Sequence, residues 1–524
     1  MSAIAGGYPI GRIEIIGCFA VFIYHCLASM WLASNSSHNL DIWLHSNIAP
    51  SEYVNGAKYD QSDIEWFLHK TVLLKLIILF SIHSVVFRAS HYFYALAQNL
   101  TRIALIVFWS AITIYITSIE CFSIVIIHAT ATIIISTYLR KEILAWISCI
   151  SFVVYASKYM YFSPEIENFY VEYTFYLYTA IQILNVCIYL CRNPTTALDL
   201  PLVLSAYEYL LYPMYSMTLI VLFDDFKKQV ELVRQRAQEG SVWQGEVNQK
   251  FLIIRAARLF ATFVLVEVFL HMIHATAIMI SPFSVLEGLN GYEIASVAYM
   301  SGQFFYLKYV VIFGMPSFFA LVDGMSPPGP PVCISRVSKY SQMWRYFDRG
   351  LYEFLKRQVY IPVMGEAKGI KLELRRFGAM VGVFVFVLTW HGFKSNYLMW
   401  VCLSAFEIMM ERAGAFISNT KPWKDFERAV GPAWALRVTA VAMDLTIVPG
   451  LLGVFYFLAQ VGTGDEIMKR LLIDGFAGLY NGEAGWGTPG GVVIHMLTLG
   501  YFYNHCCLYL EHVNHPRLQK VKTE

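Results

Sequence analysis

The 524-residue sequence has little charge: Asp, Glu, Lys and Arg make up 15% of it, whereas a soluble globular protein carries about a quarter. Hydrophobic residues reach 57% and aromatic residues 16%. The formal net charge of +2 is small, so the composition does not point to nucleic acid as a partner. No polar stretch is large enough to form a soluble domain with its own core. These absences leave a membrane protein as the predicted class.

Recognisable cysteine patterns are also missing. The ten cysteines show no CxxC pair and no metal-ligand spacing, and most fall inside apolar runs, which argues against a disulfide framework. The first apolar run, residues 13–32, has no small-residue cleavage site and contains Glu14 and His25. It is therefore predicted to be a retained first span rather than a signal peptide.

Apolar runs of spanning length recur along the chain. A span needs about 20 apolar residues, and the candidates are residues 13–32, 71–87, 103–117, 122–139, 143–162, 170–190, 252–280, 295–321, 433–458 and 492–510. Residues 202–223 are apolar but have basic residues on both sides, which favours a re-entrant segment. Together with a central stretch at 344–411, they predict an all-α polytopic membrane protein with about 10–12 transmembrane helices plus one or two re-entrant segments.

Basic residues mark the predicted cytoplasmic side. Residues 331–376 hold ten Lys and Arg residues against four acids, and the C-terminal tail is basic as well. The alternation of charge places both termini in the cytoplasm. It also suggests an N-terminal bundle (1–224), a cytoplasmic amphipathic linker (225–250) and a C-terminal half (251–524). The glycine-rich residues 462–491 are predicted to form a loop.

Two ionisable residues of the central stretch are candidates for chemistry. An apolar run at 377–388 leads to Trp390-His391-Gly392, and an aromatic segment ends at Asp348. Ionisable groups in a hydrophobic layer are costly unless they are used or paired, and imidazole suits proton transfer near neutral pH. Structural alternatives stay open. Histidines in apolar runs often only bond a neighbouring helix, as His25, His83, His128, His271 and His274 could, and Asp348 could pair with Arg345 or Arg349.

The residues around this pair carry a resemblance. The matching segments are Tyr306-Leu307-Lys308-Tyr309, Gly314-Met315-Pro316-Ser317, Asp323-Gly324, Pro330-Pro331 with Cys333, residues 343–351, residues 359–363 and Trp390-His391-Gly392. In this combination the sequence resembles the membrane-bound O-acyltransferase superfamily, and within it the hedgehog acyltransferase branch. The resemblance covers residues 300–412, the implied acyltransferase core, and extends weakly over most of the chain. A related vertebrate branch lacks the histidine and is thought inactive, so His391 favours an enzyme.

The resemblance implies a reaction and a set of site residues. A long-chain acyl-CoA, palmitoyl-CoA, would enter from the cytoplasm along Trp344, Arg345, Arg349 and Trp390. The acceptor would be the N-terminal amine of a secreted signalling protein, hedgehog-like or EGF-like, at the endoplasmic reticulum membrane. His391 would remove the amine proton and Asp348 would orient the donor or the imidazole. Cys333 would bind a structural haem b, or would instead be a free or palmitoylated cysteine.

Other functions remain open at this point. A lipid or GPI-anchor remodelling O-acyltransferase of the same superfamily would share these motifs. A transporter or a non-catalytic scaffold would share the apolar runs, although the two related halves of many transporters are not visible. Near the C-terminus, Lys520 and Lys522 have the form of a lysine-based retrieval signal, and they would equally suit a positive anchor for the last span.

Overall fold

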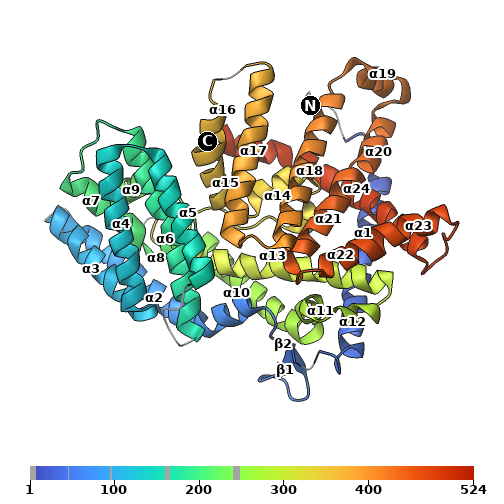
Figure 1. The fold of residues 1–524 in the computed structure, drawn as a ribbon, viewed down its shortest axis with the longest axis horizontal. Helices are drawn as coiled ribbons and strands as arrows, with labels where there is room; N and C mark the ends of the chain where they lie inside the picture. The colour runs from blue at the N-terminus through green and yellow to red at the C-terminus, as the bar shows by residue number, and fades with distance from the viewer. Residues whose placement is uncertain are drawn as a thin grey trace.

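A computed structural model of the protein describes residues 8–523 except 45, 95–96, 160–165, 240–247 and 367. The described chain is almost entirely helical (Figure 1), as the sequence predicts. The exception is an antiparallel hairpin of β1 (Ile48–Pro50) and β2 (Lys58–Asp60).

The helices of the first half are α1 (Arg12–Asn39), α2 (Ile64–Tyr94), α3 (Gln98–Ile116), α4 (Ile119–Leu139), α5 (Glu142–Tyr159), α6 (Ile166–Arg192), α7 (Leu200–Leu211), α8 (Pro213–Ser216) and α9 (Phe223–Gln238). Those of the second half are α10 (Gln249–Met272), α11 (Ala275–Ile280), α12 (Phe283–Glu287), α13 (Gly291–Val322), α14 (Tyr340–Tyr346), α15 (Arg349–Leu355), α16 (Ile361–Met364), α17 (Ile370–His391), α18 (Ser395–Ile417), α19 (Lys421–Val430), α20 (Pro432–Ala442), α21 (Asp444–Leu458), α22 (Thr463–Met468), α23 (Asp474–Tyr480) and α24 (Pro489–Thr523). Short turns of other helix types lie at Ile334–Arg336, Lys356–Tyr360 and Lys469–Ile473.

Seven helical stretches in the described part of the chain are long and apolar enough to cross a membrane: Arg12–Asn39, Ile64–Tyr94, Gln98–Ile116, Ile119–Leu139, Asn168–Arg192, Gly291–Val322 and Pro432–Leu458. Helices α10, α17, α18 and α24 have 24, 22, 23 and 35 residues. At 1.5 Å per residue these also reach the roughly 30 Å of a bilayer core. The polytopic membrane class is therefore confirmed.

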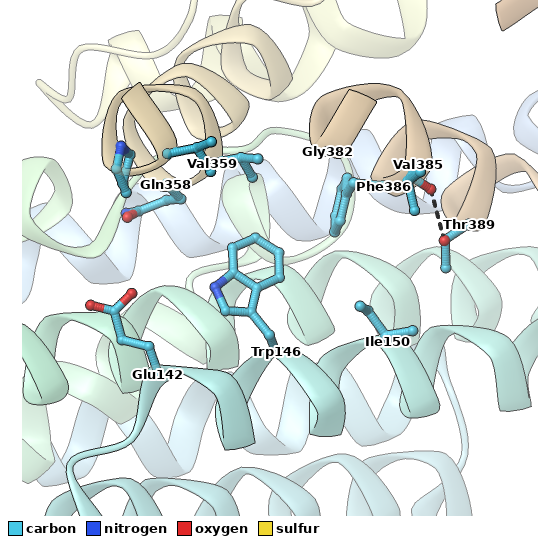
Figure 2. Close-up of a pocket in the computed structure, with 11 residues that line it drawn as sticks. Glu142, Trp146, Ile150, Gln358, Val359, Gly382, Val385, Phe386 and Thr389 are labelled. Atoms are coloured by element: carbon cyan, nitrogen blue, oxygen red, sulfur yellow. Dashed lines mark hydrogen bonds between the residues drawn. The ribbon is translucent and has the colours of Figure 1, made fainter. Parts of the chain in front are cut away.

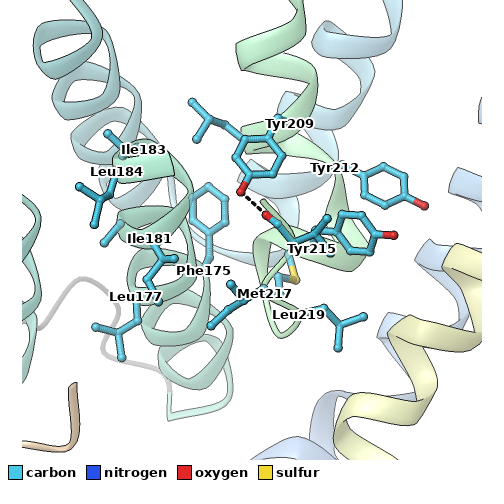
Figure 3. Close-up of a cluster of buried hydrophobic side chains, with 14 of the residues drawn as sticks. Phe175, Leu177, Ile181, Ile183, Leu184, Tyr209, Tyr212, Tyr215, Met217 and Leu219 are labelled. Atoms are coloured by element: carbon cyan, nitrogen blue, oxygen red, sulfur yellow. Dashed lines mark hydrogen bonds between the residues drawn. The ribbon is translucent and has the colours of Figure 1, made fainter. Parts of the chain in front are cut away.

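The structure fits the sequence prediction for residues 202–223 but not for the glycine-rich residues 462–491. The predicted re-entrant segment breaks at Tyr212, and residues 217–222 are not helical, while nearly all its side chains are buried. Its packing against α6 is seen in Figure 3, where the Tyr209 hydroxyl donates to the carbonyl of Val221. Buried irregular backbone of this kind is what a re-entrant segment requires. The glycine-rich region predicted as a loop is instead mostly helical, because α22 and α23 occupy much of it.

Helix α13 forms the centre of the molecule. In Figure 1 it lies across the middle, with α14, α17, α18 and α21 above it and α10, α11 and the β-hairpin below. The start of α1 and the end of α24 lie in the upper half of that view, with α19, whereas the hairpin lies at the bottom. Helices α14, α17, α18 and α21 contact one another and position the candidate site against α13.

Candidate active site

His391 is the last residue of α17, at the end of an apolar helix. The helix stops there because Gly392 has a φ of +86°, a conformation that favours glycine. The half-buried imidazole lies among three aromatic rings: Tyr397 and Trp400 of α18 at centroid distances of 6.0 and 5.4 Å, and Phe457 of α21 at 5.1 Å. We call His391, Tyr397, Trp400 and Phe457 the histidine cage.

The ring nitrogens of His391 make no hydrogen bond to any residue that the structure describes. Four of the histidines in other apolar runs differ, since a ring nitrogen is hydrogen-bonded: His25 to His495, His83 to Asp323, His128 to Ser148 and His271 to Ser51. The ring of the fifth, His274, makes no hydrogen bond within the described chain but lies 3.5 Å from the carboxylate of Asp41. Those five fit the structural interpretation of a histidine in a membrane helix. His391 does not, and its nitrogens are available to a substrate.

Helix α14 joins the histidine cage to Asp348. Trp344 and Phe347, three residues apart, lie on the same side of this helix. Trp344 stacks on Trp400 at 5.4 Å, and Phe347 stacks on Phe305 of α13 at 5.4 Å. Phe305 in turn meets Phe457 edge-on at 5.5 Å. One layer of aromatic rings therefore connects the segment that carries Asp348 with the cage around His391.

Asp348 occupies the turn between α14 and α15, two seven-residue helices too short to span a bilayer. Its side chain caps α15 by accepting a hydrogen bond from the Leu351 N–H at 2.9 Å. Burial raises the pKa of this carboxyl to about 6. No ion pair with Arg345 or Arg349 is formed in the described structure, so the alternative that Asp348 merely pairs with a neighbouring arginine is wrong.

The other predicted residues lie around this centre at varying depth. Arg345 and Arg349 are exposed, and Arg345 lies over the ring of Tyr352. Trp390 faces α6, where it meets Tyr178 edge-on at 5.6 Å. Through this contact, α6 closes the site on the side of Trp390.

Cys333 lies apart from the histidine cage, in the segment between α13 and α14. Burial raises the pKa of its thiol above the ordinary value, which disfavours the thiolate that would bind iron. Within the described ranges, no group of three or more His, Cys, Asp or Glu side chains could hold a metal ion. The residues around Cys333 thus give the haem expectation no support.

The structure contains a buried cluster of charged residues that the sequence did not predict. Lys308 of α13 is 4% exposed and forms ion pairs with Asp63 at 2.7 Å and Glu65 at 2.8 Å. Glu65 also accepts the Tyr309 hydroxyl at 2.9 Å, and the Tyr309 ring contacts Phe347 at 6.0 Å. We call Asp63, Glu65 and Lys308 the acidic cluster. It approaches the site from the side of the β-hairpin.

A second polar group lies behind Trp400. The Trp400 indole donates to the Tyr340 hydroxyl at 3.3 Å, and that hydroxyl is 3.0 Å from Ser404. Close by, Glu407 is fully buried, and neither of its oxygens has a hydrogen-bond partner among the described residues. A buried charge without a partner is expensive, so Glu407 is cheapest to bury in its neutral form. In the sequence, Glu407 could be recognised as an acid inside an apolar run.

Fold and site together define a class: a polytopic helical membrane protein in which an imidazole lies among aromatic rings, without a hydrogen-bond partner among the described residues. A layer of aromatic rings links this imidazole to the segment of a partly buried aspartate. Comparison with known proteins identifies the family. Residues 54–443, more than half of the chain, match the model of the MBOAT, membrane-bound O-acyltransferase family. The chain belongs to this family, and it is an acyltransferase.

Individual relatives agree with this assignment. The chain is 26% identical to the protein-cysteine N-palmitoyltransferase HHAT of Mus musculus over 402 residues, which cover 73% of this chain and 74% of the relative. It is 34% identical to the protein-cysteine N-palmitoyltransferase Rasp of Drosophila melanogaster over 181 residues, 34% of this chain and 36% of the relative. It is 25% identical to the membrane-bound O-acyltransferase GUP1 of Saccharomyces cerevisiae over 232 residues, 44% of this chain and 38% of the relative.

Proposed function

We propose that this acyltransferase moves a palmitoyl group from palmitoyl-CoA to the N-terminal amine of a secreted signalling protein, with His391 as the general base. The observation that carries the proposal is the imidazole of His391, which has no hydrogen-bond partner among the described residues and lies in an aromatic cage. A general base needs a free nitrogen within reach of the proton it removes, and the cage fixes the ring while leaving that nitrogen open.

The charge of the acidic cluster supports an amine as the acceptor. Asp63 and Glu65 carry two negative charges and Lys308 carries one positive charge, so the cluster has a net charge of −1. The Glu65 side chain is 37% exposed, and Tyr309 connects it to Phe347, next to Asp348. A net negative site on this path attracts an N-terminal ammonium and gives no advantage to a neutral lipid hydroxyl.

The bound ammonium first loses one proton to solvent, and the nitrogen of the neutral amine then attacks the thioester carbonyl carbon. The new C–N bond forms, the C–S bond breaks, and the products are an amide and CoA. His391 takes the proton that the amine loses and returns it to the departing CoA sulfur. The aromatic rings exclude water, which would otherwise hydrolyse the thioester.

The remaining site residues act on the donor. Trp344 stacks on the cage residue Trp400, and Trp390 directly precedes His391, so both line the acyl end of the proposed donor path. The exposed Arg345 and Arg349 lie where the CoA phosphates would contact the protein. Asp348 orients the donor or the imidazole from the turn at the start of α15. The names of the mouse and fly relatives support the palmitoyl group and a protein acceptor.

We further infer that the protein acts in the endoplasmic reticulum membrane with both termini in the cytoplasm. This is supported by the start of α1 and the end of α24, which lie in the upper half of Figure 1 with the basic helix α19, opposite the β-hairpin. The hairpin side carries Asp60, Asp63, Glu65 and Glu287, as expected for a luminal face. The acyl-CoA would then enter from above and the acceptor from below.

The test uses the purified full-length protein with palmitoyl-CoA and three acceptors: a peptide with a free N-terminal cysteine, the same peptide N-acetylated, and a lysophospholipid. Palmitoylation of the free peptide alone, as a hydroxylamine-resistant amide, is the expected result. Transfer to the lysophospholipid in place of the peptide would reject the amine acceptor and favour the lipid-remodelling alternative. His128→Ala serves as a control for removing a histidine from a membrane helix, because His128 bonds Ser148 away from the cage.

A further inference from the structure

A groove on the outer side of the bundle lies between α5 and α17. It has a volume of about 340 Å³. Figure 2 shows Trp146 and Ile150 of α5 on one side and Gly382, Phe386 and Thr389 of α17 on the other. Its lining is mostly apolar: Glu142, Trp146, Ile150, Gln358, Val359, Pro362, Val363, Gly382, Val385, Phe386 and Thr389. Several of these side chains face outward, including Val385 (51% exposed).

The groove is separate from the histidine cage. Gly382 and His391 are nine residues apart, two and a half helical turns, so they point to opposite sides of α17. The floor is further closed by Trp146, which meets Phe386 at 5.9 Å and Phe354 at 6.1 Å. The groove therefore has no part in the reaction proposed above.

Glycine creates the depression in α17. A Cβ atom at Gly382 would come 3.4 Å from Val359, an ordinary contact, and one at Gly378 would meet nothing within 4 Å. The two glycines are four residues apart and share one face of the helix with Phe386 and Thr389. From Gly378 to Thr389 this face runs for roughly 16 Å. That length suits most of one extended fatty acyl chain.

The same face of α17 carries two cations at its start. Lys371 and Arg375 precede Gly378 by seven and three residues, and both are exposed. Arg375 donates to the carbonyl of Met364, next to the groove residue Val363, and Lys371 forms no ion pair in the described structure. The acids at this end are offset: Glu142 pairs with Arg192 at 2.9 Å, Glu373 pairs with Arg376, and Lys368 lies two residues from Glu366. The charge at the mouth of the groove is thus positive.

We propose that this groove binds one glycerophospholipid with an anionic headgroup. The headgroup phosphate lies between Lys371 and Arg375, and one acyl chain lies along Gly378 and Gly382 between α5 and α17. The two cations suit the anionic headgroup, and the apolar groove suits the acyl chain. Each Lys or Arg near the headgroup strengthens binding roughly fivefold. A bound lipid would join the first half of the chain to α17, the helix that carries His391.

The test measures lipid binding to the delipidated full-length protein in detergent by native mass spectrometry. The probes are phosphatidylglycerol, phosphatidylcholine with the same acyl chains, and glycerol 3-phosphate as a headgroup without chains. Wild type is expected to bind one phosphatidylglycerol at least fivefold more tightly than phosphatidylcholine, and glycerol 3-phosphate far more weakly. Equal binding of the two lipids, or equal binding of glycerol 3-phosphate, would overturn the proposal.

Variants locate the site. Gly382→Phe and Val385→Phe fill the groove from its floor and its outer edge, and each should lose the bound phosphatidylglycerol, whereas Gly382→Ala should keep it. The double variant Lys371→Gln, Arg375→Gln should lose the preference for phosphatidylglycerol, whereas Lys424→Gln, an exposed cation on α19, should not. Wild-type phosphatidylglycerol binding in both filling variants, or an unchanged preference in the double variant, would place the lipid elsewhere.

Discussion

Replacing Glu65 by Gln removes one charge from the acidic cluster and with it the ion pair to Lys308, which keeps Asp63 as a partner at 2.7 Å. Gln has the same length and keeps an oxygen that can accept the Tyr309 hydroxyl, now 2.9 Å from Glu65. The net charge of Asp63, Glu65 and Lys308 changes from −1 to 0. If the cluster attracts the acceptor ammonium, this variant should weaken binding of the peptide and leave the chemical step intact.

The expected size follows from Coulomb's law. A unit charge at about 6 Å is worth about 3 kcal/mol at an effective dielectric constant of 20. The Glu65 side chain is more than a third exposed, so solvent screening reduces this to about 1 kcal/mol. That corresponds to a roughly fivefold rise in KM for the peptide. The KM for palmitoyl-CoA and the kcat should stay within about twofold, because neither depends on this charge.

The assay is the initial rate of amide formation against peptide concentration at two ionic strengths. For wild type, the KM for the peptide should rise with salt, because screening weakens the attraction. For Glu65→Gln this salt dependence should be smaller. Glu52→Gln is the matched control, because Glu52 is an exposed acid of the same hairpin region and makes no hydrogen bond or ion pair within the described chain. An unchanged KM in Glu65→Gln would refute the electrostatic account of the acceptor.

Three further predictions concern stability and topology. Burial raises the pKa of Asp348 from the ordinary 3.8 to about 6, so between these two pH values the folded protein holds a proton on this carboxyl that the unfolded chain has lost. The stability that this protonated carboxyl contributes to the folded state is therefore lost as the pH rises through 6. Asp348→Asn, which keeps the cap on α15, should therefore gain in melting temperature relative to wild type between pH 5 and pH 8, and a constant difference would contradict the burial. Ala57→Thr creates a sequon at the exposed Asn55 of the hairpin, and glycosylation there in microsomes is expected; modification absent at Asn55 but present at a cytoplasmic-side sequon would invert the topology. Replacing Lys520 and Lys522 by Ser should move part of the protein beyond the endoplasmic reticulum in cells, whereas unchanged localisation would assign retention to the membrane spans.

The sequence is most informative where an ionisable side chain interrupts or adjoins a run of apolar residues. His391 and Asp348 are ionisable residues beside apolar runs, which makes them candidates, but the resemblance of the surrounding motifs is what singles them out, and their catalytic roles stay predictions. The membrane class and most span positions follow from the same signal, because a bilayer demands long apolar helices. Whether a histidine has a hydrogen-bond partner cannot be predicted from hydropathy, because it depends on how the helices pack. Only the structure separates His391 from His128 or His83, whose partners lie on other helices.

Other features could not be predicted because they join distant segments. Lys308 meets Asp63 across 245 positions of sequence, and acids before a span look like ordinary loop charges. Trp400 and Phe457 lie in apolar runs, where an aromatic side chain can face the lipid as readily as it can pack around His391. The sequence therefore does not identify them as cage residues. The glycine-rich region misleads for another reason. Glycine is unfavourable in a helix by only about 1 kcal/mol per residue, and packing of α23 against α24 outweighs it.

The central claim is that His391 removes the proton of the acceptor amine. The most direct measurement is single-turnover formation of the palmitoyl amide by purified His391→Ala, compared with wild type and His128→Ala at saturating palmitoyl-CoA and peptide. We predict that His391→Ala still binds palmitoyl-CoA but forms the amide at least 100-fold more slowly, the lower range for the loss of a general base. His128→Ala should retain the wild-type rate. A folded His391→Ala protein that forms the amide at the wild-type rate would contradict the account.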